Sequence, residues 1–158
     1  MWSCNYGFEH QFEPSMSRHD RLIEQAMRVA QTSQHKKWQL GGVMTRGSKF
    51  LSSAPNKFRN HPWINHLHAT RHAEMEAIRK CLNGTRGATI YVARADKDGL
   101  PRMARPCSRC MKELYLAGVR EVVYTTDDGS YRVERVREDS PTKNLLSGVD
   151  SPEESPVR

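Results

Sequence analysis

Two short motifs in this sequence carry residue types that bind zinc. One is HAE at residues 72–74, and the other is PCSRC at residues 106–110. The C-x-x-C spacing places two thiolates one turn apart at the start of a helix, and His72 supplies a third ligand. Three protein ligands leave the fourth tetrahedral position open for water, which distinguishes a catalytic zinc from a structural one. The sequence therefore predicts one Zn²⁺ per chain, bound by His72, Cys107 and Cys110.

Glu74 follows the predicted histidine ligand by two residues and is not needed to hold the metal. Zinc lowers the pKa of a bound water from ~15.7 to about 7, so hydroxide is available at neutral pH. A carboxylate within reach of that water can move protons between it and a substrate. The two motifs together predict a hydrolytic site in which Glu74 is the catalytic proton shuttle.

Two other interpretations use the same residues. A closed structural zinc site needs a fourth ligand, which would have to be Cys81 or one of the upstream histidines, and it leaves Glu74 without a role. Those histidines are His61, His66 and His68. A redox pair of the thioredoxin type follows a strand in a βαβ unit and has no His-x-Glu partner. Only the catalytic interpretation gives every residue of both motifs a role.

The composition is that of one soluble domain. The chain has 158 residues, of which 37% are hydrophobic, enough for a single core. It has no run of about 18 apolar residues, so we expect no membrane span, and its first residues lack the pattern of a signal peptide. Two of the four cysteines lie in the metal motif, which favours a reducing, cytoplasmic setting over a disulfide framework.

The charge is basic and unevenly distributed. The net charge is +7, yet residues 138–158 hold five acidic and two basic side chains, so the rest of the chain carries +10. A basic body suits an anionic partner. We expect a small-molecule nucleotide or nucleoside first and nucleic acid second, although an ordinary solvated basic surface would have the same composition.

Hydrophobic periodicity predicts alternating helices and strands between residues 17 and 137, which we take as the catalytic domain. Ser17 is the expected N-cap of an amphipathic helix that runs to about Thr32. Strands are expected at 40–45, 49–53, 88–93, 119–125 and 131–136, and further helices at 72–82 and 107–116. Residues 54–71 form a long connection of a kind that is usually functional or disordered. We expect residues 1–16 to be an irregular lead-in and the acidic residues 138–158 to be a disordered tail.

With the motifs placed, the chain resembles the cytidine and deoxycytidylate deaminase superfamily, especially its deoxycytidylate deaminase-like, phage-type members. The resemblance runs from about Ser17 to Thr126 and rests on SQHKKWQLGGVMTRGSKFLSSAPNK, HAEMEAI and PCSRCMKELYLAGVREVVY. H-x-E with P-C-x-x-C is a known signature of zinc nucleobase deaminases. The resemblance implies an α/β fold with a central mixed sheet in a three-layer α-β-α arrangement. It also implies a homo-oligomer that hydrolyses a cytosine nucleotide, dCMP to dUMP, and releases ammonia.

The resemblance also points to residues that would bind the substrate. Asn56 falls where the family has an Asn that contacts the sugar, and the backbone N–H of Ala73 would lie near the base carbonyl. The family's Gly-Tyr-Asn is Ala54-Pro55-Asn56 here, and Glu76 stands where deoxycytidylate deaminases often have Asn. A carboxylate at that position would be unfavourable beside a phosphate, unless it points to solvent.

Cations and one aromatic side chain near the motifs are further candidates for substrate binding. Lys57, Arg59 and Arg71 flank the motif regions in sequence and could meet a 5′-phosphate, since both residue types bind phosphate. Cations in a surface loop would give the same pattern. Tyr124 could stack on a base, but its place at the end of a strand also suits core packing.

Other functions fit the same zinc ligands. A deaminase acting on tRNA or single-stranded DNA would use the basic body and would need exposed aromatic rings for stacking. A guanine deaminase shares the His-Ala-Glu pattern. A non-enzymatic zinc module that binds nucleic acid is the alternative from outside the enzymes, and it predicts no ammonia release from any base.

Overall fold

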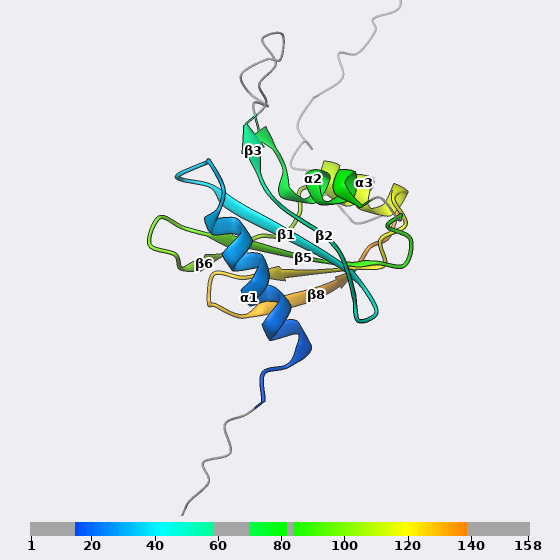
Figure 1. The fold of residues 1–158 in the computed structure, drawn as a ribbon, viewed down its shortest axis with the longest axis horizontal. Coiled ribbons are helices and arrows are strands. Elements are labelled where there is room, and N and C mark those ends of the chain that lie inside the picture. Colours follow the sequence, from blue (N-terminus) through cyan, green and yellow to red (C-terminus); the bar gives the residue numbers. More distant parts are fainter. Residues whose placement is uncertain (1–14, 59–69, 82–83, 139–158) are drawn as a thin grey trace, which may run out of the picture.

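The computed structural model describes residues 15–58, 70–81 and 84–138 (Figure 1). Its longer elements follow the predicted order of helices and strands. They are α1 (Arg18–Gln31), β1 (Gln39–Arg46), β2 (Lys49–Pro55), α2 (Ala73–Lys80), β5 (Thr89–Ala95), α3 (Ser108–Leu116), β7 (Glu121–Thr125) and β8 (Tyr131–Arg135). Three two-residue strands were not predicted: β3 (Lys57–Phe58), β4 (Thr70–Arg71) and β6 (Pro101–Arg102).

The main sheet is mixed, as predicted. Its strand order is β2-β1-β5-β7-β8, and β6 pairs with β5 beside this path. β5 and β7 are parallel, whereas β1 pairs antiparallel with both β2 and β5, and β8 pairs antiparallel with β7. The parallel pair requires a crossover connection, and α3 lies in that connection. β3 and β4 pair in a separate two-stranded ribbon.

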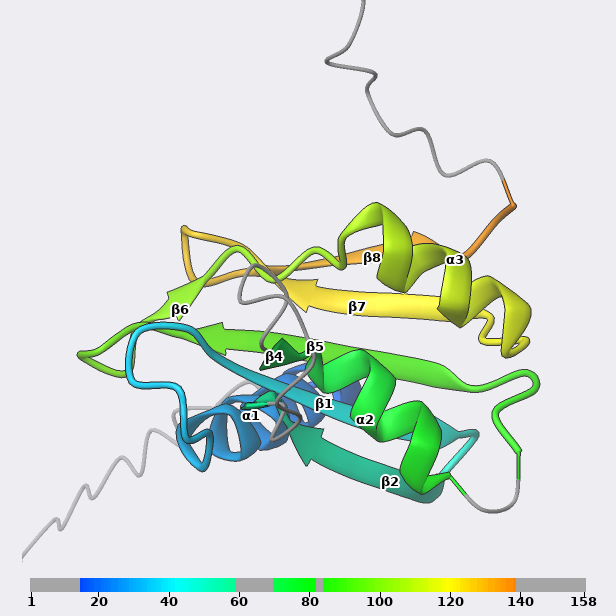
Figure 2. The same ribbon diagram turned by 90° about the horizontal axis from the view of Figure 1, so that it is seen from above.

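The helices cover both faces of this sheet, so the predicted three-layer arrangement is confirmed (Figure 2). α1 buries Ala26 against Val43, Tyr91 and Val123 on one face. On the other face, α2 and α3 pack beside each other. The second core there contains Met44, Ala77, Ile90, Val92, Met111, Leu114 and Val122. β5 contributes to both cores, which explains its almost continuous apolar sequence.

The first helix begins where the sequence predicts. Ser17 accepts a hydrogen bond from the Asp20 backbone N–H, and the Asp20 carboxylate accepts one from the Ser17 N–H. This reciprocal capping box pairs two backbone donors that the helix itself cannot pair. The helix ends at Thr32, its C-cap.

Two consecutive glycines allow β1 to lie closely between helices on opposite faces of the sheet. A Cβ atom on Gly41 would lie 2.3 Å from the Ala26 carbonyl oxygen and 2.4 Å from the Ala30 nitrogen, both backbone atoms of α1. A Cβ on Gly42 would lie 3.3 Å from the Ala73 carbonyl oxygen at the start of α2. The absence of side chains at these positions therefore sets how close both helices come to β1.

The predicted ends of the chain fall mostly outside the described residues. This holds for the lead-in at 1–16, apart from residues 15 and 16, and for the tail at 138–158, apart from residue 138. The middle of the predicted connection, residues 59–69, also lies outside them. Within the described ranges, no helix has the length and apolar character needed to cross a membrane.

The close approach at Gly41 gives a stability prediction. Gly41→Ala should lower the free energy of unfolding by about 3 kcal/mol or more, because the methyl group meets helix backbone that cannot rotate away. Gly42→Ala is the matched control and should cost less, since its nearest contact is 3.3 Å. Thermal and urea unfolding would measure both variants. Equal stability of the two would contradict the packing described.

Candidate active site

The two zinc-binding motifs lie at the starts of two neighbouring helices. His72 is the N-cap of α2 and Cys107 is the N-cap of α3, and neither makes a side-chain capping hydrogen bond. α2 and α3 lie on the same face of the sheet (Figure 2), which brings together segments 35 residues apart. A helix N-terminus carries a partial positive charge, so both helices favour thiolate over thiol at this point.

The three predicted metal ligands do converge. The ligand atoms of His72, Cys107 and Cys110 all lie within 4.8 Å of one another. The Cys110 Sγ is 3.2 Å and the Cys107 Sγ is 3.8 Å from the His72 Nδ1. Two sulfurs and one imidazole nitrogen are a donor set that zinc takes in catalytic sites. These three residues would hold the ion.

The closed-site interpretation with Cys81 as fourth ligand is wrong. Cys81 is the C-cap of α2, at the other end of the helix from His72. Its thiol lies 3.2 Å from the Gly84 carbonyl oxygen and donates to it. The three histidines considered as alternatives, at positions 61, 66 and 68, lie outside the described residues.

Glu74 lies beside the ligands and is almost completely enclosed. Only 2% of its surface is exposed, and its Oε2 has no hydrogen-bond partner within the described residues. Burial raises the pKa of Glu74, although its own backbone N–H and the charge of His72 act in the opposite direction. An unpaired buried carboxylate oxygen is costly. Its presence beside a three-ligand metal site fits a group that exchanges protons with a metal-activated water.

The side chains of the three ligands shift one another's pKa values. A hydrogen bond from Cys110 lowers the pKa of Cys107 to about 3, and a hydrogen bond to His72 acts in the same direction. The same hydrogen bond between the two cysteine side chains raises the pKa of Cys110, and burial adds to that rise. The hydrogen bond to Cys107 likewise raises the pKa of His72. One thiolate is thus already present, and a bound Zn²⁺ would displace the remaining proton.

A cleft of ≈ 280 Å³ opens onto the metal ligands and Glu74. Its walls come from the α1–β1 loop, the start of β1, the segment after β2 and the residue before the PCSRC motif. The lining residues are His35, Trp38, Leu40, Asn56, His72, Glu74, Arg105 and Cys107. The volume is close to the lower end of the range for small-molecule sites.

Asn56 lies in this cleft, as the resemblance implied, and its side chain makes three hydrogen bonds within the protein. Its Oδ1 accepts from the Ser33 hydroxyl at 2.6 Å and from the Leu40 N–H at 3.0 Å. Its Nδ2 donates to the Trp38 carbonyl at 2.7 Å. The amide therefore fixes the loop that forms the cleft wall. Any role in sugar binding would add to this structural one.

Ala73 is the first residue of α2 and is buried next to the cleft. The first N–H groups of a helix have no partner inside that helix. The backbone N–H of Ala73, between His72 and Glu74, is therefore of the kind that can donate to a base carbonyl.

Of the remaining predicted substrate-binding residues, those that the structure describes do not line the cleft. Lys57 is exposed on β3, and Arg71 on β4 pairs with Glu76. Arg59 lies outside the described residues. Tyr124 is 5% exposed within the core around α3, and its hydroxyl donates to Glu134 at 3.4 Å. Core packing, the other interpretation of Tyr124, therefore describes its position.

The expectation that Glu76 could point to solvent was wrong, because its carboxylate is buried and paired. It is 1% exposed, and its two oxygens accept from Arg71 and Arg79, each at 3.1 Å. Burial raises the pKa of Glu76, but the hydrogen bonds and charges of both arginines outweigh it, and the net pKa is lowered. Glu76 thereby links β4 to the middle of the helix that carries the site.

Sequence reasoning missed four of the lining residues: His35, Trp38, Leu40 and Arg105. Arg105 immediately precedes the PCSRC motif, and that adjacency was a usable signal. His35 and Trp38 come from the α1–β1 loop and Leu40 from the start of β1, a segment whose shape depends on Asn56 and that has no recognisable motif. Trp38 is 43% exposed, and the Arg94 guanidinium lies 3.8 Å from its ring centroid, within the range of a cation–π contact.

Comparison with known proteins agrees with this site. Residues 16–126 match the cytidine and deoxycytidylate deaminase zinc-binding region. The apo dCMP deaminase of cyanophage S-TIM5 is 21% identical with a TM-score of 0.55, and the match covers 69% of this chain and 84% of that chain. The cytidine deaminase of Burkholderia pseudomallei is 20% identical with a TM-score of 0.57, and the match covers 77% of this chain and 94% of that chain. At these identities, the structural matches establish a shared fold. No match was found among curated protein sequences.

The ligand geometry predicts which cysteines hold zinc. Cys107→Ser and Cys110→Ser should each lose most of the bound zinc, because a serine hydroxyl is a much poorer zinc ligand than a thiolate. Cys81→Ser is the matched control and should keep the wild-type zinc content. Mass spectrometry of the metal in each dialysed protein would measure this. Zinc loss in the Cys81 variant would show that the ligand set is incorrectly assigned.

The buried carboxylate of Glu76 predicts a loss of stability on truncation. Glu76→Ala should lower the free energy of unfolding by about 2 kcal/mol. This loss is smaller than that for breaking a fully buried ion pair, because both arginine side chains can return to water. Glu24→Ala removes the exposed partner of Arg28 and should cost under about 1 kcal/mol. Urea unfolding of both variants gives the comparison. A Glu76 variant as stable as the Glu24 variant would refute the linking role.

Proposed function

This chain belongs to the family of cytidine and deoxycytidylate deaminases, and we propose that it hydrolyses a cytosine-containing nucleotide or nucleoside, with dCMP to dUMP as the first candidate reaction. The broader activity, that of a zinc-dependent hydrolase acting on a C–N bond, follows from the family and the ligand set. The observation that carries the proposal is the unpaired, buried Oε2 of Glu74 beside those ligands.

The chemistry needs one water molecule and a group that moves its protons. A zinc ion held by His72, Cys107 and Cys110 supplies Lewis-acid activation of that water. Glu74 takes a proton from the water as the water oxygen adds to C4 of the cytosine ring. Glu74 then delivers that proton to N3. The second proton from water leaves with the C4 amino group as ammonia. Uracil and ammonia together account for all the atoms of cytosine and water.

The raised pKa of Glu74 suits this role. A carboxyl group in an apolar enclosure holds a proton more readily than one in water, which suits a group that accepts a proton and returns it during one reaction cycle. The enclosure also excludes bulk water that would compete for the proton. The Ala73 N–H is placed to hold the base carbonyl while this transfer takes place.

We propose a phosphorylated substrate in preference to a bare nucleoside, with the cations in and near the cleft as candidate phosphate contacts. Arg105 lines the cleft and pairs with Glu134 through two hydrogen bonds. Lys57, Arg59 and Arg71 remain candidates from the neighbouring segments. The S-TIM5 dCMP deaminase has been solved in complex with dCMP and dUMP, which supports a nucleotide monophosphate. We also propose that the protein is a homo-oligomer.

A single variant tests the assigned role of Glu74. Glu74→Gln should retain zinc but lose turnover by ~10²–10⁴-fold, because the amide cannot transfer protons. Ammonia release from dCMP would measure activity, with zinc content as the control for an intact site. Near-full activity in a zinc-loaded Glu74→Gln protein would exclude Glu74 as the proton shuttle.

The same assay also tests the substrate class. The wild-type protein would be offered cytidine, deoxycytidine, CMP, dCMP, dCTP, guanine and a single-stranded oligonucleotide. The proposal expects fastest ammonia release with dCMP. Release from the oligonucleotide alone, weakening steeply with added salt, would replace it with a polynucleotide deaminase. If none of these compounds released ammonia, the remaining interpretation would be a non-enzymatic zinc module.

A further inference from the structure

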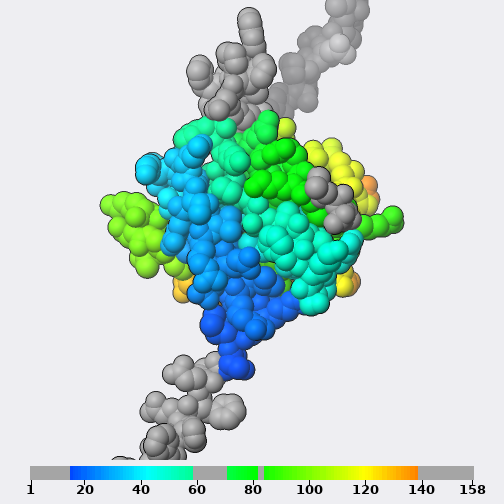
Figure 3. Space-filling model, viewed as in Figure 1, coloured from blue at the N-terminus to red at the C-terminus, as the bar shows by residue number. Residues whose placement is uncertain are grey.

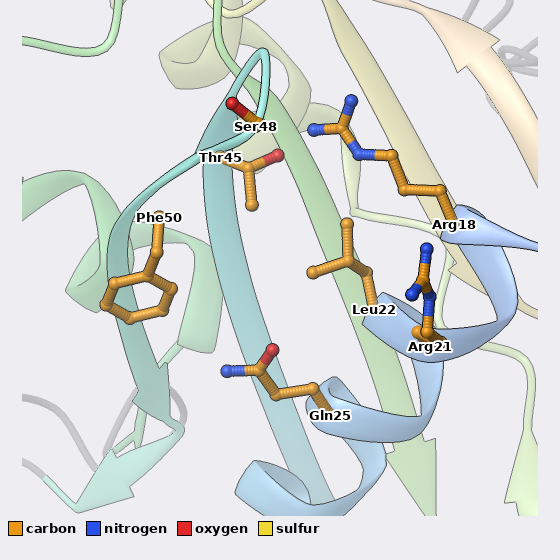
Figure 4. Close-up of a pocket in the computed structure, with 7 residues that line it drawn as sticks. All are labelled: Arg18, Arg21, Leu22, Gln25, Thr45, Ser48 and Phe50. Carbon is orange, nitrogen blue, oxygen red and sulfur yellow. The ribbon is translucent and has the colours of Figure 1, made fainter.

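A second cleft lies away from the zinc ligands, between the first turns of α1 and the β1–β2 hairpin. It encloses ≈ 460 Å³ and is lined by Arg18, Arg21, Leu22, Gln25, Thr45, Ser48 and Phe50 (Figure 4). The N-terminal part of α1 and the hairpin lie side by side on this face of the molecule (Figure 3). The active-site cleft begins beyond the other end of α1, a helix of 14 residues, so the two are about 20 Å apart. They share no lining residue.

The cleft concentrates positive charge where a helix does not favour it. Arg18 and Arg21 are three residues apart and therefore neighbours on one side of α1. Both lie in its first turn, at the end where the helix dipole is itself positive. Within the described residues neither guanidinium is paired with a carboxylate. Asp20 caps the helix backbone instead, and Glu24 pairs with Arg28. An anion between the two guanidinium groups would relieve this repulsion.

A buried hydroxyl provides a second, independent indication of a ligand. Thr45 is 3% exposed, and its Oγ1 has no hydrogen-bond partner among the described residues. The β1–β2 register shifts between Met44 and Thr45, and such irregularities re-aim side chains. In Figure 4 the hydroxyl points into the cleft, toward the side where Arg18 lies. A buried hydroxyl without a partner is destabilising, and a ligand oxygen in the cleft would supply that partner.

The opposite wall offers an apolar surface. Phe50 is 51% exposed although it is a large aromatic residue, and it faces the same cleft together with Leu22. Guanidinium groups match phosphate oxygens, and an exposed ring suits stacking with a flat base. We propose that this cleft binds a nucleotide unit. Its phosphate lies between Arg18 and Arg21, a phosphate or sugar oxygen pairs with Thr45, and its base packs on Phe50.

Calorimetric titration of the zinc-loaded protein with AMP tests the proposal, because adenine is not a substrate for cytosine deamination. Inorganic phosphate and adenosine are the two partial probes, and a short oligo(dA) distinguishes a polynucleotide from a free nucleotide as the source. AMP should bind about tenfold or more tightly than either partial probe. Tighter binding of oligo(dA) at the same residues would make a nucleic-acid strand the source.

Substitutions of the lining residues test whether AMP binds in this cleft. Arg18→Ala combined with Arg21→Ala should weaken the affinity for AMP about tenfold or more. Phe50→Ala should reduce the affinity for AMP to nearly that for inorganic phosphate. Lys49→Ala removes a cation from the same hairpin outside the cleft lining and should have little effect. Zinc content and melting temperature serve as folding controls. Unchanged AMP affinity in the double arginine variant, or adenosine binding as tightly as AMP, would overturn the proposal.

Thr45→Val gives a readout that a purely structural role would not produce. The change removes the buried hydroxyl and keeps the side-chain shape, so the protein without ligand should melt at the wild-type temperature or above it. The same variant should bind AMP more weakly. A Thr45 variant that is stable and binds AMP as the wild type does would show that the hydroxyl is not part of the site.

Discussion

The site depends on two helix starts meeting over the same face of one sheet. His72 and Cys107 precede helices that are separate in sequence, yet their side chains must come within reach of a single ion. The parallel pairing of β5 with β7 places α3 beside α2, and the glycine at position 42 lets the start of α2 approach the sheet. The site therefore requires a glycine at position 42 of β1 as well as the ligands themselves.

Two buried carboxylates on one turn of α2 show how surroundings separate structural from chemical roles. Glu74 and Glu76 are both at most 2% exposed, but their pKa values move in opposite directions. Glu76 has a guanidinium on each oxygen and stays ionised, so it ties elements together. Glu74 keeps one oxygen without a partner and holds a proton more readily. The second environment is the one that proton transfer requires.

The sequence was informative where a residue's role depends on its near neighbours. The His-x-Glu and C-x-x-C spacings, the capping box at Ser17 and Asp20, and the alternation of helices and strands are all local patterns, and the structure agrees with them. Glu76 was misjudged because Arg71 becomes its partner only when β4 folds against α2, although Arg79 is its i,i+3 neighbour on the same helix. Trp38 and His35 were missed because their loop is shaped by hydrogen bonds to Asn56, across more than fifteen residues of chain.

The three long helices differ in how their first residues are used. α1 is capped by its own Ser17 and Asp20, so its first turn is complete without any ligand. The N-cap residues of α2 and α3 make no side-chain capping hydrogen bond, and these are the residues that would hold the metal. The His72 ring instead contacts the sulfurs of Cys107 and Cys110. α2 and α3 thus lack the reciprocal cap that α1 has, and a bound zinc ion would join the starts of the two helices.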